Sequence, residues 1–345
     1  MKTNKLIIAI ITSTVLLVSC EKEIEFNGEQ TDPKLVINSL MEPGQPVKAR
    51  IGKSCFFLDY KRDHSMPEGT VAQLYINDNF VGNMDMVTDS IEVMFYTLQG
   101  DSIGYQFEKH FQSDYCPQEG DVVKITASAP GFDDVEAETS PLPNALEAQL
   151  SADVAHWDSW YEYAYNDTYE EKTDSLLKMN AEVTLTLELT DPNPGQVDCF
   201  KIYIPNWKHD HPLQNSYDCS FEYDDPIFGS ALPNNEYIDF SDLDTKPLGV
   251  FTDVLFDGKS YQLKVKMTVW LTVDVEYDPA FFQLPIKLEH LSKEYYNYLY
   301  TCDQGDMSMQ LFAEPIQTYS NVKGGYGIVA GHTVDTLWFA LPLEE

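Results

Sequence analysis

The sequence is poor in basic residues. Lysine and arginine together number 22, against 56 aspartate and glutamate residues, so the formal net charge is −34. A chain with this excess of negative charge repels phosphate backbones and anionic membrane surfaces. Nucleic acid is therefore excluded as a partner, and we expect a strongly solvated surface.

Long apolar runs are also missing. The longest, Leu6–Val18, follows Lys2 and Lys5 near the start of the chain. It is too short for a bilayer span, which needs about 20 residues. Its length is that of the apolar segment of a secretory signal. We therefore expect residues 1–19 to be a signal peptide, with no membrane-spanning helix after them.

Ser19 followed by Cys20 resembles the lipobox of bacterial lipoproteins. The resemblance implies acylation of the Cys20 thiol and cleavage before it, so that acyl chains anchor the mature protein in a membrane. An ordinary signal peptide with a cysteine near its end is the alternative. Residues 20–32 are expected to be a flexible acidic tether. Within it, Glu21, Lys22 and Glu23 resemble the export signal that sends such lipoproteins to the outer face of the outer membrane.

Motifs for nucleophilic catalysis and structural zinc are absent. The sequence has no GxSxG, HExxH or CxxC pattern. Besides Cys20 there are five cysteines, an odd number, so at least one thiol should be free. The candidate disulfide pairs are Cys55 with Cys116 and Cys199 with Cys219, which would leave Cys302 unpaired.

Short segments with period-two alternation dominate the chain, so the predicted fold is mainly β with two β-sandwich-like domains. Residues 33–140 form the first, and their GDVVKITASAPGFDDVEAETSPLP stretch resembles the closing strands of carboxypeptidase-regulatory-like and transthyretin-like sandwiches. Residues 141–180 are predicted to be a linker and an aromatic-rich insertion. Residues 181–345 form a second β-domain.

The second domain carries two sharp local signals. Asp257-Gly258, between two β-like runs, predicts a hairpin turn. LSKEYYNYLYTC predicts the one packed helix, near 292–302, with Ser292 as its N-cap and Leu291 and Tyr296 as a hydrophobic staple.

Aromatic residues crowd the predicted insertion beside carboxylates. Such groups stack sugars or hold peptides, and they also serve as packing between domains. The spacing does not separate ligand or partner contact from packing. The residues in question are Trp157, Trp160, Tyr161 and Tyr163.

Metal ligands are suggested at a few places. His209 and His211 could share an ion if the segment were extended, although Pro212 favours solvated histidines in a loop. No organic cofactor is expected. Calcium is the only cation for which acidic turn-like segments exist. The aspartates in these segments are Asp191, Asp198, Asp224, Asp225, Asp239, Asp242 and Asp244.

The glycine-rich stretch SNVKGGYGIVAG, residues 320–331, could be taken for a phosphate-binding loop. Such a loop needs its lysine after the glycines and a helix behind them. Here Lys323 precedes the glycines and a β-like run follows. We therefore interpret these glycines as a bulge or a close approach of two backbones.

The C-terminal stretches LSKEYYNYLYTCDQGD and FAEPIQTYSNVKGGYGIVAGHTVDTLWFALP resemble Bacteroidota lipoproteins catalogued as domain of unknown function 4249. The opening PKLVINSLMEPGQPVKARIGKSCFFLD resembles that family too. The resemblance implies an outer-membrane lipoprotein that faces the cell exterior and works beside a TonB-dependent transporter. No catalytic residues are defined for the family.

We therefore expect a non-enzymatic, lipid-anchored accessory protein that binds a transporter, a nutrient ligand or both. The alternative is a surface hydrolase or metal-binding protein that uses the His209 and His211 loop or a carboxylate pair. A structural adhesin is a third class, but the tandem arrays typical of it are absent from the sequence.

Overall fold

The computed structural model describes residues 32–56, 63–97, 100–165, 172–205, 216–229, 249–274, 281–305 and 318–342. Within these ranges the chain is mainly β, as the sequence pattern predicts. The strands form three sheets, and one α-helix, α2 (Lys293–Gly305), packs against the largest of them. No helix in the described ranges has the length and apolarity needed to cross a bilayer.

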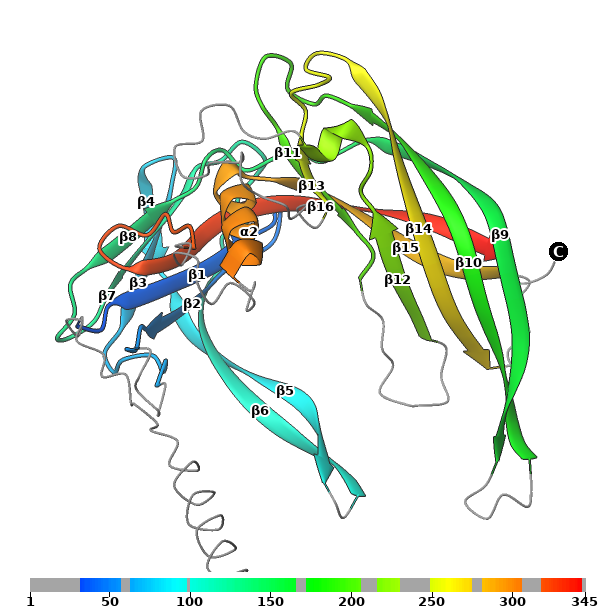
Figure 1. The fold of residues 1–345 in the computed structure, drawn as a ribbon. Coiled ribbons are helices and arrows are strands. Elements are labelled where there is room, and N and C mark those ends of the chain that lie inside the picture. The colour runs from blue at the N-terminus through cyan, green and yellow to red at the C-terminus, as the bar shows by residue number, and fades with distance from the viewer. Residues whose placement is uncertain are drawn as a thin grey trace, which may run out of the picture.

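The largest sheet has eight strands and passes through both halves of the molecule (Figure 1). Strand β16 joins the halves because its first six residues pair in parallel with β1 and the remaining eleven pair antiparallel with β15. In sheet order the strands are β13 (Val250–Thr252), β11 (Cys199–Tyr203), β15 (Phe281–Leu291), β16 (Tyr326–Pro342), β1 (Leu35–Met41), β2 (Val47–Lys53), β6 (Gly100–Ser113) and β5 (Asp85–Thr97).

Each half of this sheet is covered by a smaller sheet of four strands, which makes the arrangement sandwich-like. The sheet over the first half contains β4 (Asn79–Asn83), β3 (Val71–Ile76), β7 (Val123–Ser128) and β8 (Val135–Glu138). The sheet over the second half contains β12 (Ser216–Glu222), β14 (Ser260–Asp274), β10 (Lys172–Thr190) and β9 (Ala148–Tyr165). A separate apolar core fills each interface, and the 3-10 helix η1 (Pro226–Gly229) adds to the second.

Strand β10 illustrates how the pattern produces the core. Its alternate residues from Met179 to Leu189 are buried in the second core, while the polar residues between them point the other way. Strand β14 repeats the pattern from Leu263 to Leu271, and the two strands pair along their length. Burial of the apolar set on one face therefore sets the register of the pair.

The prediction of a linker over residues 141–180 is wrong for most of that segment. Residues 148–165 form β9, and β10 begins at Lys172 and pairs with it. The period of two is broken because Ala155 is an extra residue: His156 lies opposite Glu182, whereas Val154 lies opposite Val183. Such a bulge moves the following side chains to the other face, which hides a strand from a pattern search.

The prediction of a hairpin at Asp257-Gly258 is also wrong. The turn exists, with Gly258 at a φ of 72°, but the strands on either side of it do not pair with each other. Strand β13 pairs with β11 in the largest sheet, and β14 pairs with β10 and β12. The turn chemistry is local, whereas the choice of partner strand depends on distant parts of the chain.

The predicted helix is confirmed. Helix α2 begins after Ser292, whose hydroxyl accepts hydrogen bonds from the backbone N–H groups of Tyr295 (3.4 Å) and Gly331 (3.2 Å). The predicted staple residues Leu291 and Tyr296 are both buried in a small cluster beneath the helix. The N-cap therefore also fastens the helix to β16.

The predicted disulfides are not formed, because all five described cysteines are free. Cys199 is buried in the cluster beneath α2, whereas Cys219 packs against the second core from another sheet. The two thiols therefore lie on different sides of the largest sheet. Cys55 instead lies beside a histidine, and the sulfur of Cys116 approaches the carbonyl oxygen of Asp114 at 3.6 Å.

Candidate functional site

Several residues singled out from sequence lie outside the described ranges. These are Cys20, Glu21, Lys22 and Glu23 at the N-terminus, His209 and His211 in the second half, and Asp239, Asp242 and Asp244. The backbone of Tyr163 lies in β9, but its side chain is not described. The lipid anchor, the export signal and the histidine pair therefore stay predictions.

The predicted aromatic group is divided between two faces of β9. Trp157 packs against the second core, opposite Ala181. Trp160 lies opposite Lys178 on the other face, with 51% of its surface exposed. Tyr161 returns to the face of Trp157 but is exposed as well. Packing and exposure thus both occur, and of the three side chains that the structure describes, Trp160 and Tyr161 are available to a partner.

Trp160 belongs to an exposed surface on the second four-stranded sheet, which we call the outer face and define by Trp160, Lys178, Asn180 and Trp270. Trp160 pairs with Lys178, and Trp270 pairs with Asn180 two residues further along β10. Both tryptophans are exposed. Lys178 forms an ion pair with Glu162 (3.4 Å), so the aromatic side chains lie among charged groups.

The hairpin of β5 and β6 carries a second exposed aromatic group. Phe111 is buried in the first core, while Phe107, on the same face of β6, is 71% exposed. Tyr105 continues that face and is also exposed. The hairpin therefore extends the apolar face past the end of the core. Figure 1 shows the ends of this hairpin and of the β9–β10 hairpin on the same side of the molecule.

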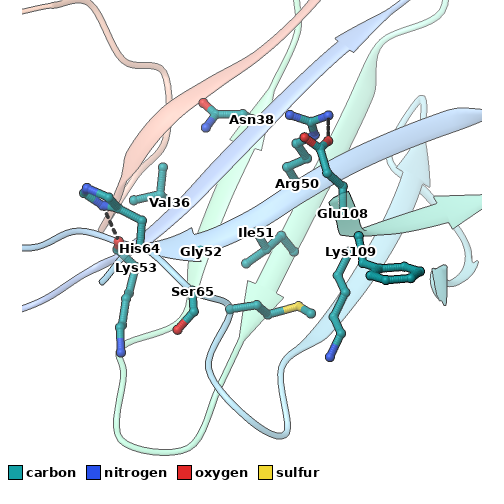
Figure 2. Close-up of a pocket in the computed structure, with 12 residues that line it drawn as sticks. Val36, Asn38, Arg50, Ile51, Gly52, Lys53, His64, Ser65, Glu108 and Lys109 are labelled. Atoms are coloured by element: carbon teal, nitrogen blue, oxygen red, sulfur yellow. Dashed lines mark hydrogen bonds and ion pairs between the residues drawn. The ribbon is translucent and has the colours of Figure 1, made fainter. Parts of the chain in front are cut away.

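A pocket of about 630 Å³ lies at the base of the β5–β6 hairpin (Figure 2). Strands β1, β2 and β6 and the segment His64–Met66 line it. Its basic groups are largely neutralised: Arg50 pairs with Glu108, and Lys53 pairs with Asp63 at 2.7 Å. The hydrogen bond from Lys53 is the main cause that lowers the pKa of Asp63 far below its usual range. Lys109 also lines the pocket, so the lining combines two ion pairs with one further basic side chain.

A thiol and an imidazole meet at the edge of this pocket. The sulfur of Cys55 lies 3.4 Å from Nε2 of His64, and Nδ1 of His64 lies 3.2 Å from the carbonyl oxygen of Lys53. An N–H on Nδ1 that donates to this carbonyl leaves Nε2 as the acceptor for the thiol. A base in reach is the first requirement of a nucleophilic cysteine. Sequence reasoning missed the pair, because its spacing matches no motif.

A polar cluster is buried between β15, β16 and α2. Glu289 accepts a hydrogen bond from the Tyr203 hydroxyl (2.8 Å) and lies 3.6 Å from Nδ1 of His332. Nε2 of His332 lies 3.5 Å from Glu42, and the ring packs edge-on against Tyr295. Burial alone would raise the pKa of Glu289, but His332 and Tyr203 outweigh it, so that pKa is lowered.

Three aspartates meet in the second half of the molecule. Asp191 and Asp198, which lie in predicted turn-like segments, come together with Asp253, for which the sequence carried no signal. All three are buried. Asp225, in contrast, accepts a hydrogen bond from the Tyr261 hydroxyl (2.6 Å) and is a structural group near η1.

The sequence profile of the family described as domain of unknown function (DUF4249) matches residues 21–337. The chain belongs to this family. A search of curated proteins found no match. Among solved structures, a protein from Corynebacterium diphtheriae described as membrane anchored is similar with a TM-score of 0.18 and 9% sequence identity. The likeness covers 76% of this chain and 55% of the other, so the chain spans about half the length of that protein.

The glycine-rich stretch of this DUF4249 protein leads into β16, which begins at Tyr326, and its structural interpretation is confirmed. Gly327 has a φ of 106°, and a Cβ there would overlap the carbonyl oxygen of Ile37 on β1. A Cβ on Gly325 would meet the carbonyl oxygen of Leu35. The glycines therefore allow the close parallel pairing of β1 with β16.

Proposed function

We propose that this DUF4249 protein is a lipid-anchored binding protein of the outer membrane. Acyl chains on Cys20 hold it, Glu21–Glu23 direct it to the outer face, and its folded part works outside the cell beside a TonB-dependent transporter. The signal-like start of the sequence and the family resemblance support this placement. Its role is accessory and non-enzymatic.

The observation that carries the proposal is the exposure of aromatic side chains beyond both cores. Phe107 and Tyr105 lie on one hairpin, and Trp160 and Trp270 lie on the outer face. Large exposed aromatic side chains rimmed by polar groups mark protein-binding surfaces, and Tyr and Trp are enriched among residues that dominate binding energy. The partner we propose is the transporter itself.

The partner test uses the lipidated protein with a C-terminal affinity tag, purified from envelopes after mild crosslinking. One variant carries Tyr105→Ser and Phe107→Ser, and another carries Trp160→Ser and Trp270→Ser. We expect at least one of them to reduce recovery of the transporter about tenfold or more, the effect of losing one strong anchor residue. Phe80→Ser removes an exposed aromatic residue from β4 and is the matched control.

Equal recovery with all three variants would contradict the proposed binding surface. The placement has its own test: protease added to intact cells should degrade the protein, and Cys20→Ala should abolish incorporation of labelled fatty acid. Survival on intact cells with degradation after lysis would contradict exposure to the exterior. Equal fatty-acid labelling of Cys20→Ala and wild type would contradict the lipid anchor at Cys20.

A further inference from the structure

The three aspartates lie where separate parts of the second half converge. Asp191 follows β10, Asp198 precedes β11, and Asp253 follows β13. One oxygen from each carboxylate lies within 4.8 Å of the others. Calcium binds carboxylate oxygens at about 2.3–2.6 Å, so two ligands on opposite sides of one ion are about 5 Å apart at most. The three oxygens thus have the spacing of ligands to a single ion.

One carboxylate oxygen of Asp253 is not used by the part of the chain that the structure describes. The side chain is 0% exposed, and its Oδ1 accepts the backbone N–H of Asp198 (3.0 Å). Its Oδ2 is buried and has no hydrogen-bond partner among the described residues. Leaving a buried acceptor without a partner costs about 1–3 kcal/mol, and more for a charged group. An atom of this kind calls for a ligand that the described residues do not supply.

The electrostatic environment of Asp253 also favours a bound cation. Burial first, and then the charges of Asp198 and Asp191, raise the pKa of Asp253 to about 7. The other two carboxylates have more hydrogen-bond donors. Asp191 accepts hydrogen bonds from the backbone N–H groups of Asn193 and Gly258, and Asp198 accepts one from the side-chain amide of Asn193. Among the described residues, the ionised form of Asp253 therefore has no positive partner.

His290 lies beside the three aspartates but supplies no ligand atom. It is 2% exposed, with Nδ1 3.0 Å from the carbonyl oxygen of Asn144 and Nε2 3.2 Å from Oδ1 of Asp198. Both nitrogens therefore face acceptors, and neither is available to an ion.

We propose that Asp191, Asp198 and Asp253 bind one Ca²⁺ ion. The donors are oxygen atoms only, since His290 already uses both of its nitrogens, and oxygen donors select calcium, magnesium or manganese over zinc. The ligands come from loops rather than from one rigid element, and such sites suit the flexible coordination of calcium better than the strict octahedron of magnesium. Water completes the coordination shell.

The ion has a structural consequence for the junction between the two halves. Asn144, in the segment between β8 and β9, donates its amide to Asn193 (3.1 Å), and its carbonyl accepts from Thr333 (2.8 Å) as well as from His290. Asn193 in turn binds both Asp191 and Asp198. Calcium would therefore tighten the network that holds the connecting segment to the second half.

The test compares purified wild-type protein with Asp253→Asn and Asp133→Asn. Asp133 is an exposed aspartate in the first half, so its variant controls for loss of one acidic charge. After EDTA treatment and dialysis, Tm is measured with and without CaCl₂ or MgCl₂, and calcium binding is measured by calorimetry. Saturating calcium should raise the Tm of the wild type and of Asp133→Asn by about 4 °C, as expected for a ligand at about 100 times its Kd.

Asp253→Asn separates an ion site from a merely structural carboxylate. The amide keeps the acceptor for the Asp198 N–H, removes the repulsion and presents donors to the neighbouring carboxylates. The variant should therefore equal or exceed the wild-type Tm in EDTA and lose at least nine-tenths of the calcium response. Asp191→Asn gives a second route if Asp253→Asn does not fold.

Three results would overturn the proposal. One is a wild-type Tm that calcium leaves unchanged, with no calorimetric binding. Another is an equal calcium response in Asp253→Asn and wild type, which would indicate diffuse binding to the acidic surface. The third is tighter binding of magnesium than of calcium. The proposal is supported if the wild type and Asp133→Asn bind one calcium ion and Asp253→Asn binds none.

Discussion

Asn321 binds the backbone of Val329 with both atoms of its side-chain amide. Its Oδ1 accepts the Val329 N–H at 3.0 Å, and its Nδ2 donates to the Val329 carbonyl at 2.8 Å. Nδ2 also lies 2.9 Å from the carbonyl oxygen of Glu138. One side chain thus takes the place of a neighbouring strand at a buried position of β16.

Replacing this amide should therefore be costly. Asn321→Ala leaves the N–H and carbonyl of buried Val329 without partners, and we expect it to lower the free energy of unfolding by about 2–4 kcal/mol. Urea denaturation measures the change. Asn83→Ala, which removes one exposed hydrogen bond to Gln73, should cost less than about 0.5 kcal/mol. Equal losses in the two variants would contradict the role assigned to Asn321.

Gly327 should not tolerate a side chain. Gly327→Ala places a Cβ against the carbonyl oxygen of Ile37 and forces a positive φ, so β1 and β16 must separate. We expect a loss of about 1–3 kcal/mol from backbone strain alone. Gly82→Ala is the matched control, since its φ is not positive and its Cβ would meet nothing within 4 Å. Thermal unfolding of both variants measures the difference in stability, and similar Tm values would contradict the prediction.

The free energy of unfolding should depend on pH through the ionisation of Glu289. Its pKa is lowered from the ordinary value of 4.5 in the folded protein, so its stabilising contribution is present above that value and is lost as the pH falls through the folded pKa. Glu289→Gln should therefore destabilise the protein near neutral pH and less so well below pH 4.5. Urea titrations across this range measure the difference. A difference independent of pH would rule out the linkage.

The free thiols should differ in reactivity. Burial raises the pKa of Cys219 to about 12 and that of Cys199 well above its usual value, whereas Cys302 is exposed. The thiolate is the reactive form, so iodoacetamide at pH 8 should label Cys302 before Cys219 and reach Cys199 only after denaturation. Mass spectrometry of the native and unfolded protein measures this order. Rapid labelling of Cys199 in the native state would contradict its burial beneath α2.

Local signals in the sequence predicted local structure. The alternation in β10 and the N-cap at Ser292 depend on neighbouring residues only, and both agree with the structure. Pairing partners depend on distant segments, so the union of β1 with β16 and the separation of β13 from β14 had no local signal. The bulge at Ala155 also had no local signal. It determines which face each aromatic residue of β9 occupies, so that Trp157 packs against the second core and Trp160 is exposed.

The acidic centre could be only half predicted. Asp191 and Asp198 lie in turn-like sequence, and turns are where calcium ligands collect. Asp253 lies in an apolar segment and joins them only because β13 pairs with β11. The approach of His64 to Cys55 likewise depends on the path of the chain beyond β2 rather than on a spacing rule.

The parallel pairing of β1 with β16 also determines when the largest sheet can be completed during folding. Val36 on β1 pairs with Tyr326 on β16, so this contact closes a loop of about 290 residues. Forming such a contact is slow, because the chain loses conformational entropy before the contact stabilises it. Until then β1 and β15 present unpaired edges that invite aggregation. On the proposed route of export, Cys20 and β1 lie near the start of the chain and β16 near its end, so the largest sheet could close only after nearly the whole chain had been exported.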